Sequence, residues 1–326
     1  IEGIWQEIYN FSRFPGGFII MSALSAIDIA LWDLSGKIAG IPVWQLLGGK
    51  CRDRIRTYGH AHGDTPDSLA ENSVEKVKKY GFSAIKCFPL SSEGSYWGTE
   101  ENILPQWSIS LRNAEKRMLA IRDALGNDVD IAVDFHASIF NPANAIEAAE
   151  ISKPIRPLFV EEPVRADNID ALAQVVQSVN VPIATGEMLY NKWQFRELLV
   201  KKAAHIVQPD VCIAGGLLEC KKISAMAESF QVTVAPHNPM GPVATAANVH
   251  LCAAIPNMLI LEYIPDDTPE RCDIVDKPVK FSDGWLEIPD KPGLGIELNK
   301  EGLEKHPPEY WHRTFKYYPD GSAAWI

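Results

Sequence analysis

Residues able to do acid, base or metal chemistry recur at nearly regular spacing through the middle of the chain. Each ends a short apolar run, and successive members are 23 to 27 residues apart: Asp134, Glu161 (or Glu162), Glu187, Asp210, His237 and Glu262. One such residue alone would most often cap a strand or face solvent. A series in register indicates a shared edge of a sheet, where an active site can form.

The first three members of this series are carboxylates. In a shared pocket, Asp134, Glu161 and Glu187 would repel one another unless a cation lay between them. Oxygen ligands without a nearby thiolate favour a hard ion, Mg²⁺ before Mn²⁺. The spacing therefore predicts a metal site, and the alternative is three independent surface acids.

His237 is the candidate general base. Asp210 ends the preceding apolar run, and a carboxylate there can accept a hydrogen bond from one ring nitrogen and raise the basicity of the other. Asn238 follows directly and is assigned to substrate binding. His136 lies two residues after Asp134, and residues two apart on a strand face the same side.

The elements that must position these residues are strands alternating with helices. Strands are predicted at 55–61, 83–88, 130–135, 158–162, 182–187, 205–210, 232–237 and 259–263. Helices are predicted at 23–40, 144–153, 191–203 and 217–230. This rhythm predicts an α/β fold with a TIM-type barrel. A doubly wound open sheet is the alternative, but no GxGxxG turn follows a strand.

Composition narrows the class of protein. The chain has 326 residues, 46% of them hydrophobic, and a net charge of −11, which argues against nucleic acid or an anionic membrane as partner. Its six cysteines are scattered without a CxxC pair, as expected of a cytoplasmic enzyme. No apolar run is expected to be long enough to span a membrane.

Six short motifs carry a resemblance to a known family. They are VDFH, FVEEP, ATGEM, QPD, APHNP and LEY, in that order. The chain resembles the enolase superfamily, mandelate racemase subgroup, and within it the galactonate dehydratase type of sugar-acid dehydratase. The resemblance implies a modified (β/α)7β barrel over 53–265 and an α+β capping domain. The cap would combine helices from 1–52 with the C-terminal segment 266–326, and its N-terminal part is expected to be incomplete.

The same resemblance implies a role for each site residue. Asp134, Glu161 and Glu187 match the ligands of Mg²⁺, for which Mn²⁺ can substitute. His237 matches the general base and Asp210 its partner.

Further roles come from the same comparison of motifs. Glu262 matches a protonated acid that hydrogen-bonds the substrate carboxylate, and His136 matches the general acid. Lys86 matches the first lysine of a KxK motif that binds substrate, whereas Phe88 replaces the second lysine.

Two histidines of the first predicted strand remain open between two uses. His60 and His62 alternate at the end of that strand and would either bind sugar hydroxyls or serve the structure. A long segment, 91–107, is expected to be an insertion that lines the mouth of the barrel.

The expected activity is the Mg²⁺-dependent dehydration of an aldonic acid to a 2-keto-3-deoxy acid, by a cytoplasmic homo-oligomer acting on a small molecule. Two alternatives stay open. The chain could epimerise or cycloisomerise a sugar acid on the same scaffold, or it could bind a sugar acid without catalysis.

Overall fold

Strands and helices alternate along the computed structural model, which describes residues 1–14, 16–90, 106–308 and 316–324. All eight predicted strands are present, most of them shorter than predicted: β1 (Arg54–Ala61), β2 (Ala84–Cys87), β3 (Asp130–Asp134), β4 (Phe159–Glu161), β5 (Ile183–Thr185), β6 (Ile206–Val207), β7 (Thr233–Val234) and β8 (Leu261–Glu262). A hairpin follows, formed by β9 (Phe281–Ser282) and β10 (Trp285–Glu287).

Helices occupy the intervals between these strands and both flanks. They are α1 (Glu2–Phe11), α2 (Phe18–Ala39), α3 (Val43–Leu46), α4 (Pro66–Tyr80), α5 (Trp107–Leu125), α6 (Pro142–Glu150), α7 (Ile169–Ser178), α8 (Lys192–Val200), α9 (Gly216–Ser229), α10 (Pro242–Ala254), α11 (Pro269–Cys272), α12 (Lys300–Lys305) and the 3₁₀ turn η1 (Lys153–Ile155). The four predicted helices correspond to α2, α6, α8 and α9. The segment predicted as an insertion lies outside the described residues, except for its last two.

The chain divides into two compact units. Unit 1 comprises residues 1–57, 186–200 and 206–308, and unit 2 comprises residues 58–185, 201–205 and 309–326. Residues 1–52 thus share a unit with strands β6 to β8. The predicted domain boundaries at 52 and 265 do not coincide with these units and stay predictions.

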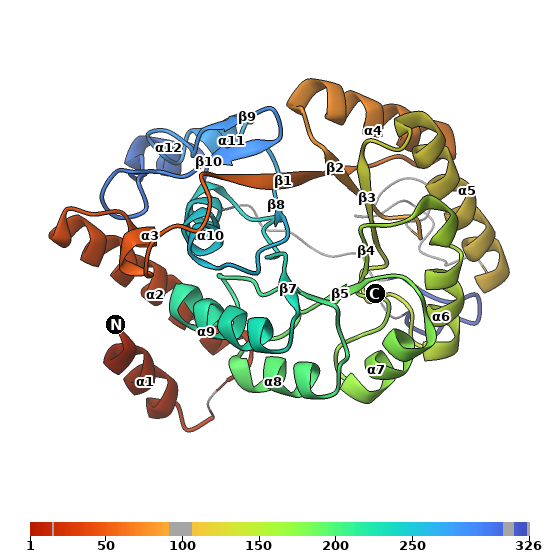
Figure 1. Ribbon diagram of the computed structural model, residues 1–326, viewed down its shortest axis with the longest axis horizontal. Helices are drawn as coiled ribbons and strands as arrows, with labels where there is room; N and C mark the ends of the chain where they lie inside the picture. The colour runs from red at the N-terminus through yellow and green to blue at the C-terminus, as the bar shows by residue number, and fades with distance from the viewer. Residues whose placement is uncertain (15, 91–105, 309–315, 325–326) are drawn as a thin grey trace. The chain divides into compact units, whose positions relative to one another are not determined.

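Unit 2 contains a run of parallel strands. β2 pairs with the end of β1 and with β3, β3 pairs with β4, and β4 pairs with β5, all in parallel. Every residue of β2, β4 and β5 is buried, as expected where both faces of a parallel sheet are covered. Helices α4 and α5 pack side by side next to β2 and β3 (Figure 1).

Local sequence explains how α4 is delimited. Thr65 and Ser68 form a reciprocal capping box at its start, with Pro66 at the first helical position. Gly81 ends the helix in the left-handed region, with φ of 70°. Because α4 ends at Gly81, the chain is free to enter β2 three residues later, at Ala84.

Unit 1 holds the later strands and the helices of both chain ends. β6 and β7 are parallel, and β10 pairs antiparallel with the first residues of β1. Helix α10 is buried along almost its whole length, although it carries Thr245, Asn248 and His250. The Nδ1 atom of His250 accepts a hydrogen bond from the backbone N–H of Trp44, 3.1 Å away.

The start of α9 is held by the N-terminal helices. Ser25 Oγ accepts the N–H of Gly215 at 2.9 Å, and Asp28 Oδ2 accepts that of Leu218 at 3.2 Å. Trp5 donates its indole N–H to the carbonyl of Gly215. Two side chains of α2 therefore supply the acceptors that the start of α9 lacks, since its N-cap residue is Gly215, and Trp5 of α1 holds the same residue through its carbonyl. Burial raises the pKa of Asp28 to about 7.

Helix α2 corrects one expectation. Its length and its mean hydropathy of 1.6 meet the requirements for crossing a membrane, whereas no such run was expected. One face of α2 is nevertheless buried inside unit 1, including Met21, Leu24 and Asp28, and the helix packs against α9. Apolar core helices meet the same requirements, so composition alone does not place α2 in a membrane.

The contact between Gly216 and Asp28 yields a stability prediction. A Cβ atom at residue 216 would overlap the Asp28 side chain, and Gly216 has φ of 82°. We expect Gly216→Ala to lower the free energy of unfolding by about 1–3 kcal/mol because it combines strain with a clash. Urea unfolding measures the change, with Gly3→Ala as the control, since a Cβ at residue 3 of α1 meets no atom. Equal stability of the two variants would contradict this account of the junction.

Candidate active site

Two of the predicted metal ligands end neighbouring strands in unit 2. Asp134 and Glu161 are register partners at the ends of β3 and β4, and both are buried. The Nζ atom of Lys86, itself buried, lies 3.2 Å from Asp134 Oδ2 and 3.0 Å from Glu161 Oε1. Glu162 accepts a hydrogen bond from the Thr185 hydroxyl instead. Glu161 therefore belongs to the Lys86 cluster.

This cluster has donors suited to a hard cation. Asp134 and Glu161 offer carboxylate oxygens only, the ligand type that Mg²⁺ prefers, and their combined charge exceeds that of Lys86. Within the described part of the chain, no group of three or more His, Cys, Asp or Glu side chains is gathered closely enough to hold a metal ion. The chemistry of Asp134 and Glu161 thus fits a divalent ion. Glu187, the third predicted ligand, lies in unit 1 and stays a prediction.

His136 lies beside Asp134 by a different route from the one predicted. β3 ends at Asp134, and His136 and Ala137 adopt φ of 52° and 53°, in the left-handed region. The backbone N–H of His136 donates to Asp134 Oδ1 at 2.7 Å, and its ring Nδ1 lies 3.7 Å from Asp134 Oδ2. A tight turn, not strand alternation, brings the two side chains together. Non-glycine residues in this conformation are strained, a feature that clusters at functional sites.

The remaining predicted residues of unit 2 form an aromatic cluster around Phe88. Its ring stacks on His62 at 5.5 Å with an interplanar angle of 7° and meets His60 edge-on at 5.5 Å. The centroids of the His136 and Phe88 rings are 6.2 Å apart, and Lys86 Nζ lies 5.6 Å from the centroid of the Phe88 ring. The structure therefore gathers His60, His62, Lys86 and His136 at the ends of β1, β2 and β3. Sequence reasoning treated Phe88 only as a missing lysine and overlooked its central position.

Unit 1 gathers the predicted base and its partners. His237 Nδ1 lies 2.8 Å from Asp210 Oδ2, and its Nε2 lies 3.5 Å from Glu187 Oε2 and 4.0 Å from Glu262 Oε2. Asp210 is buried and also accepts the backbone N–H of Cys212 at 2.6 Å. Because Asp210 accepts the proton on Nδ1, the lone pair of a neutral imidazole lies on Nε2.

The surrounding carboxylates determine the charge of this imidazole. Burial alone would lower the pKa of His237, but Glu187, Glu262 and Asp210 raise this pKa to about 10. With all three carboxylates ionised, the ring keeps both of its protons at neutral pH. A neutral base therefore requires less negative charge around Nε2.

Asn238 has an unexpected environment. It is fully buried, and its side-chain amide bonds to Thr245 and to the carbonyl of Glu262, while Asn248 donates to its oxygen. Thr245 and Asn248 were not among the predicted site residues. Their sequence signal is the presence of polar residues inside the apolar segment that forms α10.

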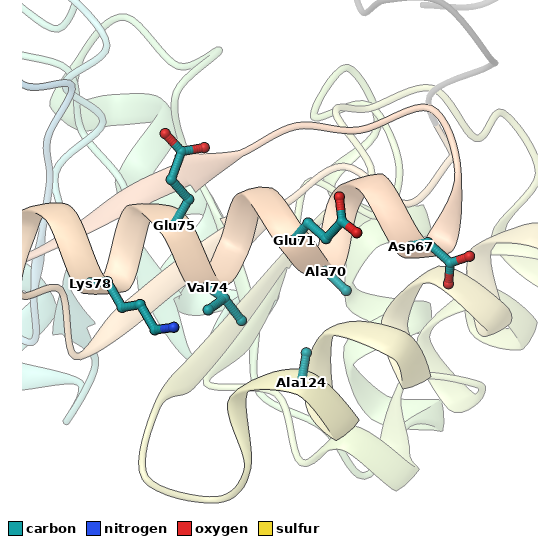
Figure 2. Close-up of a pocket in the computed structure, with 7 residues that line it drawn as sticks. All are labelled: Asp67, Ala70, Glu71, Val74, Glu75, Lys78 and Ala124. Atoms are coloured by element: carbon teal, nitrogen blue, oxygen red, sulfur yellow. The ribbon is translucent and has the colours of Figure 1, made fainter.

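A groove of about 580 Å³ lies between α4 and α5 in unit 2. Figure 2 shows Ala70 and Val74 of α4 facing Ala124 of α5, with Asp67, Glu71, Glu75 and Lys78 around them. The charged residues follow the spacing of a solvent-facing helix surface. None of the predicted site residues lines this groove.

Comparison with known proteins establishes the family. Residues 68–302 match the family described as enolase C-terminal domain-like. Residues 1–48 match the N-terminal domain of mandelate racemase and muconate lactonizing enzyme. The chain therefore belongs to the enolase superfamily, in the mandelate racemase subgroup. Its fold class is accordingly α/β, with a TIM-type barrel and a capping domain.

Individual relatives narrow the class of enzyme. D-galactonate dehydratases from Xanthomonas euvesicatoria and Pectobacterium atrosepticum are each 36% identical, over 99% of this chain and 84% of theirs. A crystal structure of an enolase from Agrobacterium radiobacter, with Na and L-malate bound, is 36% identical. It matches with a TM-score of 0.91 over 100% of this chain and 84% of that one. These relatives place the chain among dehydratases, which are hydro-lyases.

Lys86 yields a prediction for unit 2. We expect Lys86→Met to lower the free energy of unfolding in EDTA by about 3–5 kcal/mol, because two buried carboxylates then lose their shared ammonium. The loss should shrink as the pH falls, since a buried carboxyl without this partner has a raised pKa and is stabilised by protonation.

The matched control is Lys280→Met. Lys280 pairs with Glu287 on the surface, at 71% and 54% side-chain exposure, where such a pair contributes about 0–1 kcal/mol. Urea unfolding at several pH values compares the two variants. A similar loss in both would mean that Lys86 does not compensate Asp134 and Glu161.

Proposed function

We propose that the protein dehydrates an aldonic sugar acid such as galactonate or gluconate, giving a 2-keto-3-deoxy acid. The observation that carries the proposal is the arrangement of His237, whose Nδ1 bonds to Asp210 while Nε2 faces two carboxylates. An imidazole with one fixed nitrogen suits the removal of a proton from carbon. The D-galactonate dehydratases among the relatives support the substrate class. The L-malate bound by a structural neighbour supports a 2-hydroxy acid.

We assign Asp134, Glu161 and Glu187 to a divalent metal, Mg²⁺ with Mn²⁺ as a substitute. A bound ion of this kind stabilises negative charge that develops on the oxygens of a substrate carboxylate. The carboxylate donors of Asp134 and Glu161 support the choice of a hard ion. Glu187 is assigned from the motif pattern.

Protein side chains carry the proton transfers in this proposal. Protonation of Glu262 lowers the negative charge around His237 Nε2, so that the ring can be neutral and take the proton from C2 there, and Asp210 stabilises the imidazolium that forms. Glu262, protonated, donates a hydrogen bond to the substrate carboxylate. His136 gives a proton to the 3-hydroxyl, which leaves as water, and the enol product then tautomerises to the ketone.

Substrate positioning falls to the cluster around Phe88. Lys86, His60 and His62 can supply hydrogen bonds to the carboxylate and hydroxyl groups of the acid. Their mutual contacts restrict ring rotation and so limit the entropy lost on binding.

We further propose that the enzyme acts in the cytoplasm as a homo-oligomer on a free sugar acid. The net charge of −11 supports a partner that is neither nucleic acid nor an anionic membrane.

A substrate screen tests the reaction. Incubation with a panel of aldonic acids and Mg²⁺ should yield a 2-keto-3-deoxy acid from at least one of them, and EDTA should abolish product formation. Product is measured as the 2-keto acid, and the remaining substrate is analysed by NMR for inverted C2. An epimer formed without loss of water would support the epimerase alternative instead. Turnover of no acid would refute the proposed dehydration.

Isotope exchange separates the two histidines. We expect His237→Asn to slow exchange of the C2 proton in deuterated water by about 10²–10⁴-fold, the usual contribution of a general base. His136→Asn is the matched control, because it should keep C2 exchange while losing dehydration. Proton NMR of the substrate follows exchange in both variants. Exchange at the normal rate in His237→Asn would show that another group is the base.

A further inference from the structure

Asn238, next to the candidate base, holds Glu262 at two points. Its backbone N–H donates to Glu262 Oε2 at 2.7 Å, and its side-chain Nδ2 donates to the Glu262 carbonyl at 3.0 Å. Both the carboxyl group and the backbone of Glu262 are thus tied to one residue.

Helix α10 fixes the side chain that makes this contact. Nδ2 of Asn238 also donates to Thr245 Oγ1 at 3.2 Å, and Oδ1 accepts from Asn248 Nδ2 at 3.1 Å. Reversing the amide would place its oxygen against the Glu262 carbonyl and its nitrogen against another donor. The amide therefore has one orientation, set by a helix whose Thr245 and Asn248 are fully buried.

The Asn238 side chain is enclosed by protein. Asn238 has no exposed surface, both protons of its amide are donated within unit 1, and its backbone N–H is donated to Glu262. A residue that bound a sugar hydroxyl would need an accessible donor or acceptor. This environment argues against the substrate contact expected from the sequence.

We propose that Asn238 is a positioning residue that fixes the Glu262 carboxyl group relative to the His237 imidazole. Glu262 Oε2 lies 4.0 Å from His237 Nε2, and residues 237 and 238 are adjacent, so one short segment sets both groups. Thr245 and Asn248 of α10 anchor that segment. The inference rests on the proposed function, in which His237 takes a proton while Glu262 binds the substrate carboxylate.

A double-mutant cycle tests whether Asn238 acts through Glu262. We expect Asn238→Ala to lower kcat about 10- to 100-fold, with KM changed far less, because it removes the side-chain bonds to the Glu262 carbonyl and to α10 that hold the segment. The backbone N–H of residue 238 that bonds to Glu262 Oε2 is kept, but the segment that carries it is no longer anchored. In the Glu262→Gln background the same substitution should lower kcat by less than about 3-fold, because the positioned group is already altered. Independent, multiplying effects would overturn the inference, and so would a rise in KM at unchanged kcat.

Two further variants separate positioning from simple loss of stability. Asn257→Ala is the matched control, because the Asn257 amide, like that of Asn238, donates two hydrogen bonds within unit 1; its acceptors are the carbonyls of Ser224 and Val232. It should lower the melting temperature without lowering kcat; an equal loss of kcat in this control would overturn the inference. If Asn238→Ala fails to fold, Thr245→Val removes one acceptor with little change of shape. Thr245→Val should then reduce kcat in the wild-type background but not in the Glu262→Gln background. A reduction of kcat in the Glu262→Gln background, or no reduction in the wild type, would overturn the inference.

A structural measurement keeps this inference distinct from the proposed function. In a crystal structure of Asn238→Ala, the Glu262 carboxyl group should be displaced or disordered relative to the wild type, whereas Asn257→Ala should leave it in place. An unmoved Glu262 would overturn the positioning role whatever the enzyme's substrate. An inactive wild-type protein with a displaced Glu262 in the variant would instead refute the dehydration and leave the positioning role supported.

Discussion

Burial of carboxylates at the strand ends is the constraint on which the rest of the site depends. An ionised acid without water must be paired or hydrogen-bonded, or it takes up a proton. The chain meets this requirement in three ways. Asp134 and Glu161 share the ammonium of Lys86, Asp210 bonds to His237 and to a backbone N–H, and Glu262 accepts the N–H of Asn238.

These pairings determine how the backbone leaves each strand. After β3 the chain turns at once, so that the N–H of His136 reaches the Asp134 carboxylate, and both His136 and Ala137 take positive φ. After β4, Glu162 also has positive φ, of 43°, and its carbonyl accepts the N–H of Ala137. The two turns support each other across neighbouring strands. Together they stabilise a conformation that neither segment would favour alone.

The sequence predicted those features that depend on repetition. Alternation of apolar and helical segments was enough to predict the strands, the spacing of 23 to 27 residues pointed to the pairing of His237 with Asp210, and the short motifs identified the family. Features that depend on a single local turn or on one helix were not predictable in the same way. The turn at His136 follows no periodic pattern. The anchoring of Asn238 depends on two polar residues of α10, Thr245 and Asn248, which do not stand out in the sequence because the helix is otherwise mostly apolar. Hydropathy was similarly ambiguous for α2, because a helix that buries one face in a protein core can be as long and as apolar as a helix that spans a membrane.

Within unit 1, a chain of hydrogen bonds connects the N-terminal helices to the loop that carries Asp210, the partner of the candidate base. The carbonyl of Asp210 accepts the N–H of Ala214 at 2.7 Å, which folds the chain after β6 into a tight turn that leads into Gly215. Ser25 of α2 accepts the N–H of Gly215, and Trp5 of α1 donates to its carbonyl. The loop that carries Asp210 is therefore held at its far end by α1 and α2. Because Asp210 bonds to Nδ1 of the candidate base, packing of these helices would influence the proposed proton transfer, although none of their residues contacts the imidazole in any described interaction.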